Sequence, residues 1–227
     1  MTTLDWGPIL LSLKLSVVTT LVLLVIGIPV AWWLSETRSW VRYPLKTLVS
    51  MPLVLPPTVL GFYLLLIFSP AFRTGRFLKE TLDLDLAFTF SGLVVGSVVF
   101  SLPFMINPLL SAFETLPKSL GEASYMLGKS RWETLFRVFI PSLKPALWSG
   151  VALTFAHTMG EFGVVLMIGG KIPGKTRVAS MAIYDEVETL NFQAAHLYAI
   201  ILFAISFSLL LFLFLMNRRA QGPLNAR

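Results

Sequence analysis

The sequence predicts an all-α, polytopic bundle of membrane-spanning helices. Of the 227 residues, 56% are hydrophobic and only 13% are charged, whereas a soluble domain carries about 25% charged residues. The apolar residues gather in blocks that reach the roughly 20 residues needed to cross a bilayer. The chain has no cysteine, so disulfides and thiolate metal sites are excluded. A soluble globular domain, a disordered chain and a disulfide scaffold are therefore all excluded.

Five apolar blocks are predicted to span the membrane, within one domain that covers residues 1–227. The blocks are residues 9–34, 47–70, 92–112, 142–168 and 196–216. The first has no basic leader and no small-residue cleavage site, so we expect it to be retained as a helix. Residues 176–190 are too few and too charged for a sixth crossing. They are predicted to form a partial or re-entrant helix that lies against protein.

The basic residues predict the orientation of the chain. Residues 35–46, residues 113–141 and the C-terminal tail, with Arg218, Arg219 and Arg227, fall on one side of a five-span chain. That side carries more lysine and arginine than the other, and a basic excess marks the cytoplasmic side. We therefore expect the N-terminus outside and the C-terminus in the cytoplasm. The net charge of +6 is explained by this bias and predicts no nucleic-acid partner.

Prolines interrupt two of the predicted spans. Pro52, Pro56 and Pro57 fall within six residues, and each removes a backbone donor that a regular helix needs. The carbonyls that lose their partners must then face protein or a wet cavity, as in the broken helices of substrate paths. Pro103 and Pro108 predict a similar break in the third block, with a simple kink as the alternative.

The fourth block carries a stripe of polar residues. Thr154, His157, Thr158 and Glu161 have the spacing of one helix face, and ionisable groups at this depth should face the bundle interior or a wet cavity. His157 and Glu161 could pair with each other. The stripe either lines a path or holds two helices together. From position and polarity, the residues predicted to line a path are Pro56, Pro57, Thr58, Thr154, Thr158 and Glu161.

The sequence shows no catalytic constellation. It has neither a two-histidine zinc pattern nor a glycine-rich phosphate loop. We therefore expect no catalytic residue, no metal and no cofactor in this chain. An ion-coupled secondary carrier would use His157 and Glu161 as its titrating pair, but such carriers have two related halves, which this sequence lacks. An intramembrane enzyme using His157 and Glu161 would need an activated nucleophile or a metal-ligand set, and the sequence shows neither.

The polar segment 113–141 predicts two short exposed helices. Pro117 ends one helix, and Ser119 with Glu122 has the pattern of a capping box for the next. Gly128 is placed to end that helix, and a second helix is predicted at 131–139. A short exposed helix after a tight turn is suited to docking into a partner.

The same segment resembles the EAA loop of ABC importer permeases. The matching residues are Glu122-Ala123-Ser124, Gly128 and Val138-x-Ile140-Pro141. Ser124 replaces an alanine of the family pattern, and Val138 and Ile140 replace an isoleucine and a leucine. The resemblance implies a type I importer permease (MetI-like) fold in which this loop docks on a cytoplasmic ATPase. The residues it assigns to coupling are Glu122, Ala123, Ser124 and Gly128.

Further matches narrow the resemblance to molybdate permeases. They are residues 51–63, 160–163, 172–176 and 181–184. Sulfate permeases share the Gly-Glu-Phe-Gly element, and tungstate permeases cannot be separated from molybdate permeases by sequence. The resemblance implies molybdate import across the plasma (inner) membrane. It also implies a homodimer embedded in lipid, two ATPase subunits that hold ATP-Mg, and an extracytoplasmic (periplasmic) molybdate-binding protein.

Overall fold

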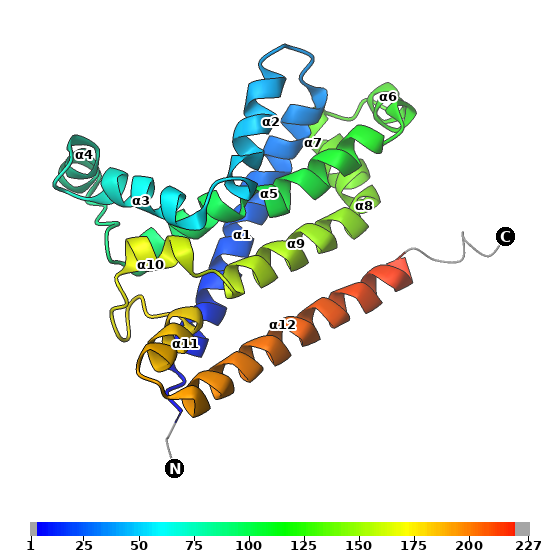
Figure 1. Ribbon diagram of the computed structural model, residues 1–227. Helices are drawn as coiled ribbons and strands as arrows, with labels where there is room; N and C mark the ends of the chain where they lie inside the picture. The colour runs from blue at the N-terminus through cyan, green and yellow to red at the C-terminus, as the bar shows by residue number, and fades with distance from the viewer. Residues whose placement is uncertain (1–3, 221–227) are drawn as a thin grey trace.

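The computed structural model describes residues 4–220, except for the side chains of residues 213 and 216–220, and this range is helical without strands. Arg218, Arg219 and Arg227 of the predicted basic tail lie outside the described side chains. The elements (Figure 1) are α1 Gly7–Glu36, α2 Arg42–Ser50, η1 Met51–Leu53, α3 Pro57–Phe68, α4 Arg73–Leu82, α5 Phe90–Thr115, α6 Lys118–Met126, α7 Arg131–Thr134, η2 Leu135–Phe139, α8 Ile140–Ser142, α9 Lys144–Met159, α10 Gly163–Gly169, α11 Ala179–Glu188 and α12 Phe192–Ala220.

Three long helices confirm the first, third and fifth predicted blocks. The helices α1, α5 and α12 are each long and apolar enough to cross a bilayer. α1 packs along α5 and α9, and the core between them contains Leu23, Met105 and Leu109, all fully buried. α12 lies on the outside against α9 and α11 (Figure 1). Its outer side chains, such as Phe203 and Phe207, are exposed and apolar, as a surface in contact with lipid requires.

The second predicted block is broken at its prolines, as expected. The segment 42–53 and helix α3 meet at an angle of 109°. Pro52 lies in the short 3₁₀ turn η1, Pro56 precedes α3 and Pro57 is its first residue. A proline is favourable at that first position because its missing N–H has no partner in the helix and its φ is already helical. The prolines thus both end one helix and begin the next.

The predicted break at Pro103 and Pro108 is wrong, because α5 runs through both residues. Neighbouring helices allow a membrane helix to tolerate proline when they stabilise the backbone around it. α5 packs against α1, α9 and α10 along its length, and Pro103 itself is buried. Packing therefore keeps this helix continuous, whereas the Pro56-Pro57 pair lies on the exposed side of its span.

The fourth predicted block is divided where no proline marks it. α9 ends at Met159, and α10 begins at Gly163 as a separate helix. On its N-terminal side α9 follows the segment 131–142, which it meets at an angle of 78°. Among the described residues, three helices have the length and composition of a span, or up to five if each bent pair forms one.

The two ends of the bundle differ in what they carry. The ends of α1 and α5 lie near α6 and α7, and α12 ends toward that side (Figure 1). The start of α1 lies near α11 at the other end. α11 has ten residues, which confirms the short helix predicted within residues 176–190. α1 and α12 thus both begin at the end of the bundle with α11 and both run toward the end with α6 and α7.

Candidate translocation path and coupling segment

The first short helix of segment 113–141 begins differently from the prediction. α6 starts at Lys118, with Pro117 as its N-cap and no capping side chain. The predicted capping box of Ser119 and Glu122 is therefore wrong. The turn at Pro117 already sets the chain for a helix at the next residue, so Ser119 falls inside the helix.

A capping box does form one helix later, at the start of α7. The Glu133 N–H donates to the Ser130 hydroxyl at 3.2 Å, and the Ser130 N–H donates to the Glu133 carboxylate at 3.3 Å. The hydrogen bond from the Ser130 backbone, followed by the contact with Lys129, lowers the pKa of Glu133 below its ordinary value of 4.5. The predicted start of the second helix at Arg131 is confirmed.

Three of the residues assigned to coupling lie on two faces of α6. Glu122 and Ala123 are exposed, whereas Ser124 is buried. The oxygens of the Ser124 and Thr134 hydroxyls are 2.9 Å apart, and the Thr134 hydroxyl also donates to the Ser130 carbonyl at 2.9 Å. Because a threonine hydroxyl has one hydrogen, Ser124 is the donor in the first contact. This bond attaches α6 to α7 and leaves the face with Glu122 and Ala123 accessible.

Gly128 ends the turn after α6, as predicted. Its φ is +75°, a left-handed conformation that glycine adopts without strain. Within the described part of the chain, no atom outside its immediate neighbours lies within 4 Å of where a Cβ would be, so the requirement is conformational and not steric. Just before it, the side chains of Met126 and Leu127 are 89% and 80% exposed. The tip of the segment therefore presents apolar side chains that a partner could cover.

The start of α7 joins this segment to the end of α1. Arg131 pairs with Glu36 at 2.7 Å and its guanidinium lies 5.9 Å from the ring centre of Trp32. Trp132 meets the same Trp32 edge to face at 5.7 Å. These contacts attach the start of α7 to α1, the helix that packs along both α5 and α9.

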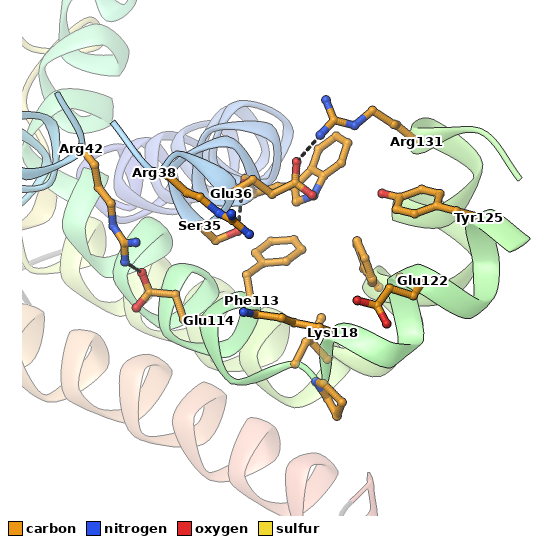
Figure 2. A pocket seen from close by; sticks show the side chains of 15 residues that line it. Ser35, Glu36, Arg38, Arg42, Phe113, Glu114, Lys118, Glu122, Tyr125 and Arg131 are labelled. Carbon is orange, nitrogen blue, oxygen red and sulfur yellow. Dashed lines mark hydrogen bonds and ion pairs between the residues drawn. The ribbon is translucent and has the colours of Figure 1, made fainter. Parts of the chain in front are cut away.

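A cavity of about 650 Å³ lies between the ends of α1 and α5 and helix α6 (Figure 2). We call it the α1–α6 pocket; its lining residues are Trp32, Ser35, Glu36, Arg38, Arg42, Phe113, Glu114, Leu116, Pro117, Lys118, Gly121, Glu122, Tyr125, Arg131 and Phe139. It contains both apolar rings and charges of both signs, and Glu122 of the coupling set lies at its edge.

Within the membrane region, the two chain breaks lie against each other. A Cβ on Gly163, at the start of α10, would be 2.6 Å from the Pro57 Cβ and 3.3 Å from the Thr58 nitrogen. A Cβ on Gly61 would be 2.8 Å from the Cβ of Met167. These two glycines let α3 and α10 approach closely, so the break after η1 and the break after α9 form one irregular region.

The residues predicted to line a path lie in two environments. Pro56, Pro57 and Thr58 are exposed, beside the irregular region. Thr154, Thr158 and Glu161 are buried, with exposures of 0%, 2% and 4%.

The polar stripe of the fourth block is rearranged by the end of α9. Glu161 lies beyond that end, so it does not share a helix face with His157, and the predicted pair does not form. The His157 Nδ1 atom is 2.9 Å from the Ser101 hydroxyl, which also contacts Thr158 at 3.0 Å. This contact joins α9 to α5, in keeping with the helix-holding interpretation of the stripe.

Glu161 has an unusual environment. Both its carboxyl oxygens are buried without a hydrogen-bond partner among the described residues. The Ser97 hydroxyl is likewise buried without a hydrogen-bond partner among the described residues. The Glu161 carbonyl accepts from the Ser180 hydroxyl at 2.6 Å, which attaches the break to α11.

The loop before α11 contains a structure that the sequence analysis missed. The Thr176 hydroxyl donates to the Gly169 carbonyl at 2.6 Å and accepts from the Ile172 N–H at 3.0 Å. Lys171 pairs with Asp185 at 2.8 Å, and this contact raises the pKa of Lys171 above its ordinary value of 10.5. The Ile-Pro-Gly-Lys-Thr stretch thus forms a closed turn, for which the Pro-Gly pair is the sequence signal.

The sequence is similar to transport permeases over nearly its whole length. A family model described as "Binding-protein-dependent transport system inner membrane component" matches residues 16–222. The chain is 46% identical over 222 residues to the "Molybdenum transport system permease protein ModB" of Azotobacter vinelandii, covering 97% of each protein. It is 35% identical over 186 residues to the "Sulfate transport system permease protein CysT" of Escherichia coli (strain K12), covering 82% of this chain and 67% of that protein.

Solved structures of ABC transporters share the fold. The inward-facing MetNI methionine ABC transporter matches with a TM-score of 0.72 and 17% identity, covering 93% of this chain and 94% of that one. A bacterial alginate ABC transporter in complex with an alginate-bound periplasmic protein matches with a TM-score of 0.76 and 19% identity, covering 95% and 79%. The predicted MetI-like fold is thereby confirmed. The chain belongs to the family of inner membrane components of binding-protein-dependent transport systems.

Proposed function

We propose that this chain is the permease subunit of an ATP-driven molybdate importer, and that the whole chain acts as one permease domain. The observation that carries the proposal is the 46% identity to a molybdenum transport permease over 97% of both proteins. Family membership and fold support a multi-pass subunit of the plasma (inner) membrane.

The partners follow from the same proposal. A second copy of the chain would complete the translocation path, and an extracytoplasmic binding protein would deliver molybdate. Cytoplasmic ATPase subunits, which hold ATP-Mg, would dock on the face of α6 that carries Glu122 and Ala123. The Ser124–Thr134 bond, the turn at Gly128 and the Arg131–Glu36 pair would then transmit the displacement of α6 to α1. The chain would need no cofactor of its own.

The path itself is proposed to run beside the irregular region where α3 meets α10. Pro56, Pro57 and Thr58 lie exposed there, and the backbone ends at a broken helix supply partial charges that suit a tetrahedral anion. Thr154, Thr158 and Glu161 would support this region from the bundle interior. A weak site of hydroxyls and backbone groups would release its cargo, whereas a strongly basic site would retain it.

Uptake of radiolabelled molybdate tests the function. The chain would be reconstituted with its ATPase and binding protein, and we expect ATP-dependent uptake that unlabelled tungstate reduces and sulfate leaves unchanged. Competition by sulfate alone would favour the second candidate, a sulfate permease, which the 35% identity to a sulfate permease supports. Uptake driven by a proton gradient without ATP would instead indicate a secondary carrier, and His157→Ala would then abolish it.

Two variants test the coupling residues. Glu122→Lys and Gly128→Asp should each lower ATP-driven uptake by about tenfold or more, because a misplaced charge in an interface costs at least ~1.4 kcal/mol. Membrane insertion should not change. The matched control is Glu80→Lys. Glu80 is an exposed residue of α4, the helix that follows α3. Wild-type uptake by both coupling variants would refute the assignment.

A further inference from the structure

The α1–α6 pocket carries charge that the coupling assignment does not use. Glu36 is paired with Arg131 at 2.7 Å, and Glu114 is paired with Arg42 and with Lys46 at 2.6 Å. These carboxylates are therefore already neutralised. The charge that remains in the lining comes from other residues.

Two cations in the pocket have no ion-pair or hydrogen-bond partner among the described residues. Arg38 lies in the loop after α1, and Lys118 is the first residue of α6. Figure 2 shows both side chains extending toward Phe113 from different walls of the pocket. The remaining carboxylate, Glu122, lies on α6 and pairs with neither of them. The cations exceed the carboxylates, so the pocket has a net positive charge.

The pocket also lies at the boundary between the spans and the polar end of the molecule. The rings of Trp32, Phe113 and Phe139 form its apolar wall. Close along the chain, Trp33, Trp40 and Tyr43 are exposed by 54% to 78%. Exposed tryptophan and tyrosine collect at the level of lipid headgroups, and basic pockets between membrane helices bind the headgroups of anionic lipids.

We propose that the α1–α6 pocket binds a phosphate-type oxyanion group, held by Arg38 and Lys118. The source of the group is either the headgroup of an anionic phospholipid or a free oxyanion, and the aromatic belt favours the headgroup. Such a ligand would join the loop after α1 to the start of α6. It would thereby limit how far the coupling segment can move relative to α1.

Thermal unfolding of the purified full-length chain in detergent tests the proposal. The probes are dioleoylphosphatidylglycerol with dioleoylphosphatidylcholine as its neutral match, and sodium phosphate with sodium chloride at equal ionic strength. The variant is Arg38→Gln with Lys118→Gln, both exposed residues whose loss should not prevent folding. Its control, Arg73→Gln with Arg76→Gln, removes the same charge from exposed positions of α4.

We expect phosphatidylglycerol to raise the unfolding temperature of the wild type and of the control at the same concentration. The double variant should need about 30-fold more lipid, since each interfacial cation contributes about 1 kcal/mol. If phosphatidylglycerol raises the unfolding temperature and phosphate does not, the ligand is the lipid headgroup. If phosphate raises the unfolding temperature as well, the pocket also binds the free oxyanion. The conservative variant Arg38→Lys should keep the response.

Native mass spectrometry provides a second readout that does not depend on stability. The wild type should retain phosphatidylglycerol that the double variant loses. An equal lipid response in wild type and double variant, or an equal loss in the control, would overturn the proposal.

Discussion

Ser124 stands where the family pattern that this segment resembles has an alanine, and the structure gives that hydroxyl a specific partner. It donates to Thr134 in a buried contact of 2.9 Å, which attaches α6 to α7. An alanine at this position would still fit the buried side of α6. The serine therefore adds one hydrogen bond to a contact that packing already allows.

Ser124→Ala should lower the stability of the segment modestly. We expect a loss of about 0.5–1.5 kcal/mol, the net value of one hydrogen bond, because Thr134 keeps its bond to the Ser130 carbonyl. Thermal unfolding of the purified chain measures the change. Ser119→Ala on the same helix is the control, since Ser119 is exposed and has no capping role. A larger loss in the control would contradict the role of the Ser124 bond.

Glu133 gives the segment a dependence on pH. Its pKa is lowered from 4.5 in the folded chain by the Ser130 backbone and Lys129. A carboxyl with a lowered folded pKa contributes stability above its unfolded value, and this contribution disappears as the pH falls through the folded pKa. The cap at the start of α7 is therefore intact at neutral pH and weakens below pH 4.5.

Glu133→Gln should thus unfold at a lower temperature than the wild type at pH 7, and the difference should shrink as the pH falls below 4.5. Unfolding temperatures across this range measure it. Glu80→Gln, at an exposed residue of α4, should show no comparable difference at pH 7. A gap between Glu133→Gln and wild type that stays constant with pH would show that the carboxylate charge plays no part.

The capping residues also show a limit of sequence reasoning. Ser119-x-x-Glu122 and Ser130-x-x-Glu133 have the same local pattern, but only the second forms a capping box. The difference lies upstream of Ser119. Pro117 is the N-cap of α6 and the helix begins at Lys118, which places Ser119 inside the helix. A four-residue pattern does not contain this information.

At the scale of helices, two breaks decide where the irregular region forms. The break at Pro56 and Pro57 was predictable because each proline removes a backbone donor. The break after α9 was not, because Gly160-Glu161-Phe162 carries no such signal. At this break Gly163 approaches Pro57 closely, a contact between segments far apart in sequence. The same kind of long-range packing keeps α5 continuous through Pro103.

Gly163→Val should separate α3 from α10. A Cβ there would be 2.6 Å from Pro57, so the two helices must move apart, at a cost of about 1–3 kcal/mol. Thermal unfolding and molybdate uptake should both decrease. Gly160→Ala in the same motif is the matched control, since its nearest atom would be 3.8 Å away and no displacement is needed. Unchanged uptake by Gly163→Val would mean that this contact does not shape the path.

For the whole molecule, sequence reasoning predicted the architecture better than the site. Long apolar blocks are summed over many residues, so errors at single positions do not change the outcome. The environment of Glu161 depends instead on where α9 ends and on Ser180 from α11. The α1–α6 pocket likewise combines the ends of three helices, and no single stretch of sequence indicates it.

The absence of cysteine from the sequence allows a direct test of the predicted orientation. Ser39→Cys, in the loop after α1, and Lys175→Cys, in the loop before α11, introduce one thiol each at exposed positions. In intact spheroplasts a membrane-impermeant maleimide should label Lys175→Cys and leave Ser39→Cys unlabelled, because a charged reagent does not cross the bilayer. After lysis both should be labelled, which shows that each thiol is accessible. Labelling of Ser39→Cys before lysis would reverse the orientation and place the coupling segment on the side away from any ATPase.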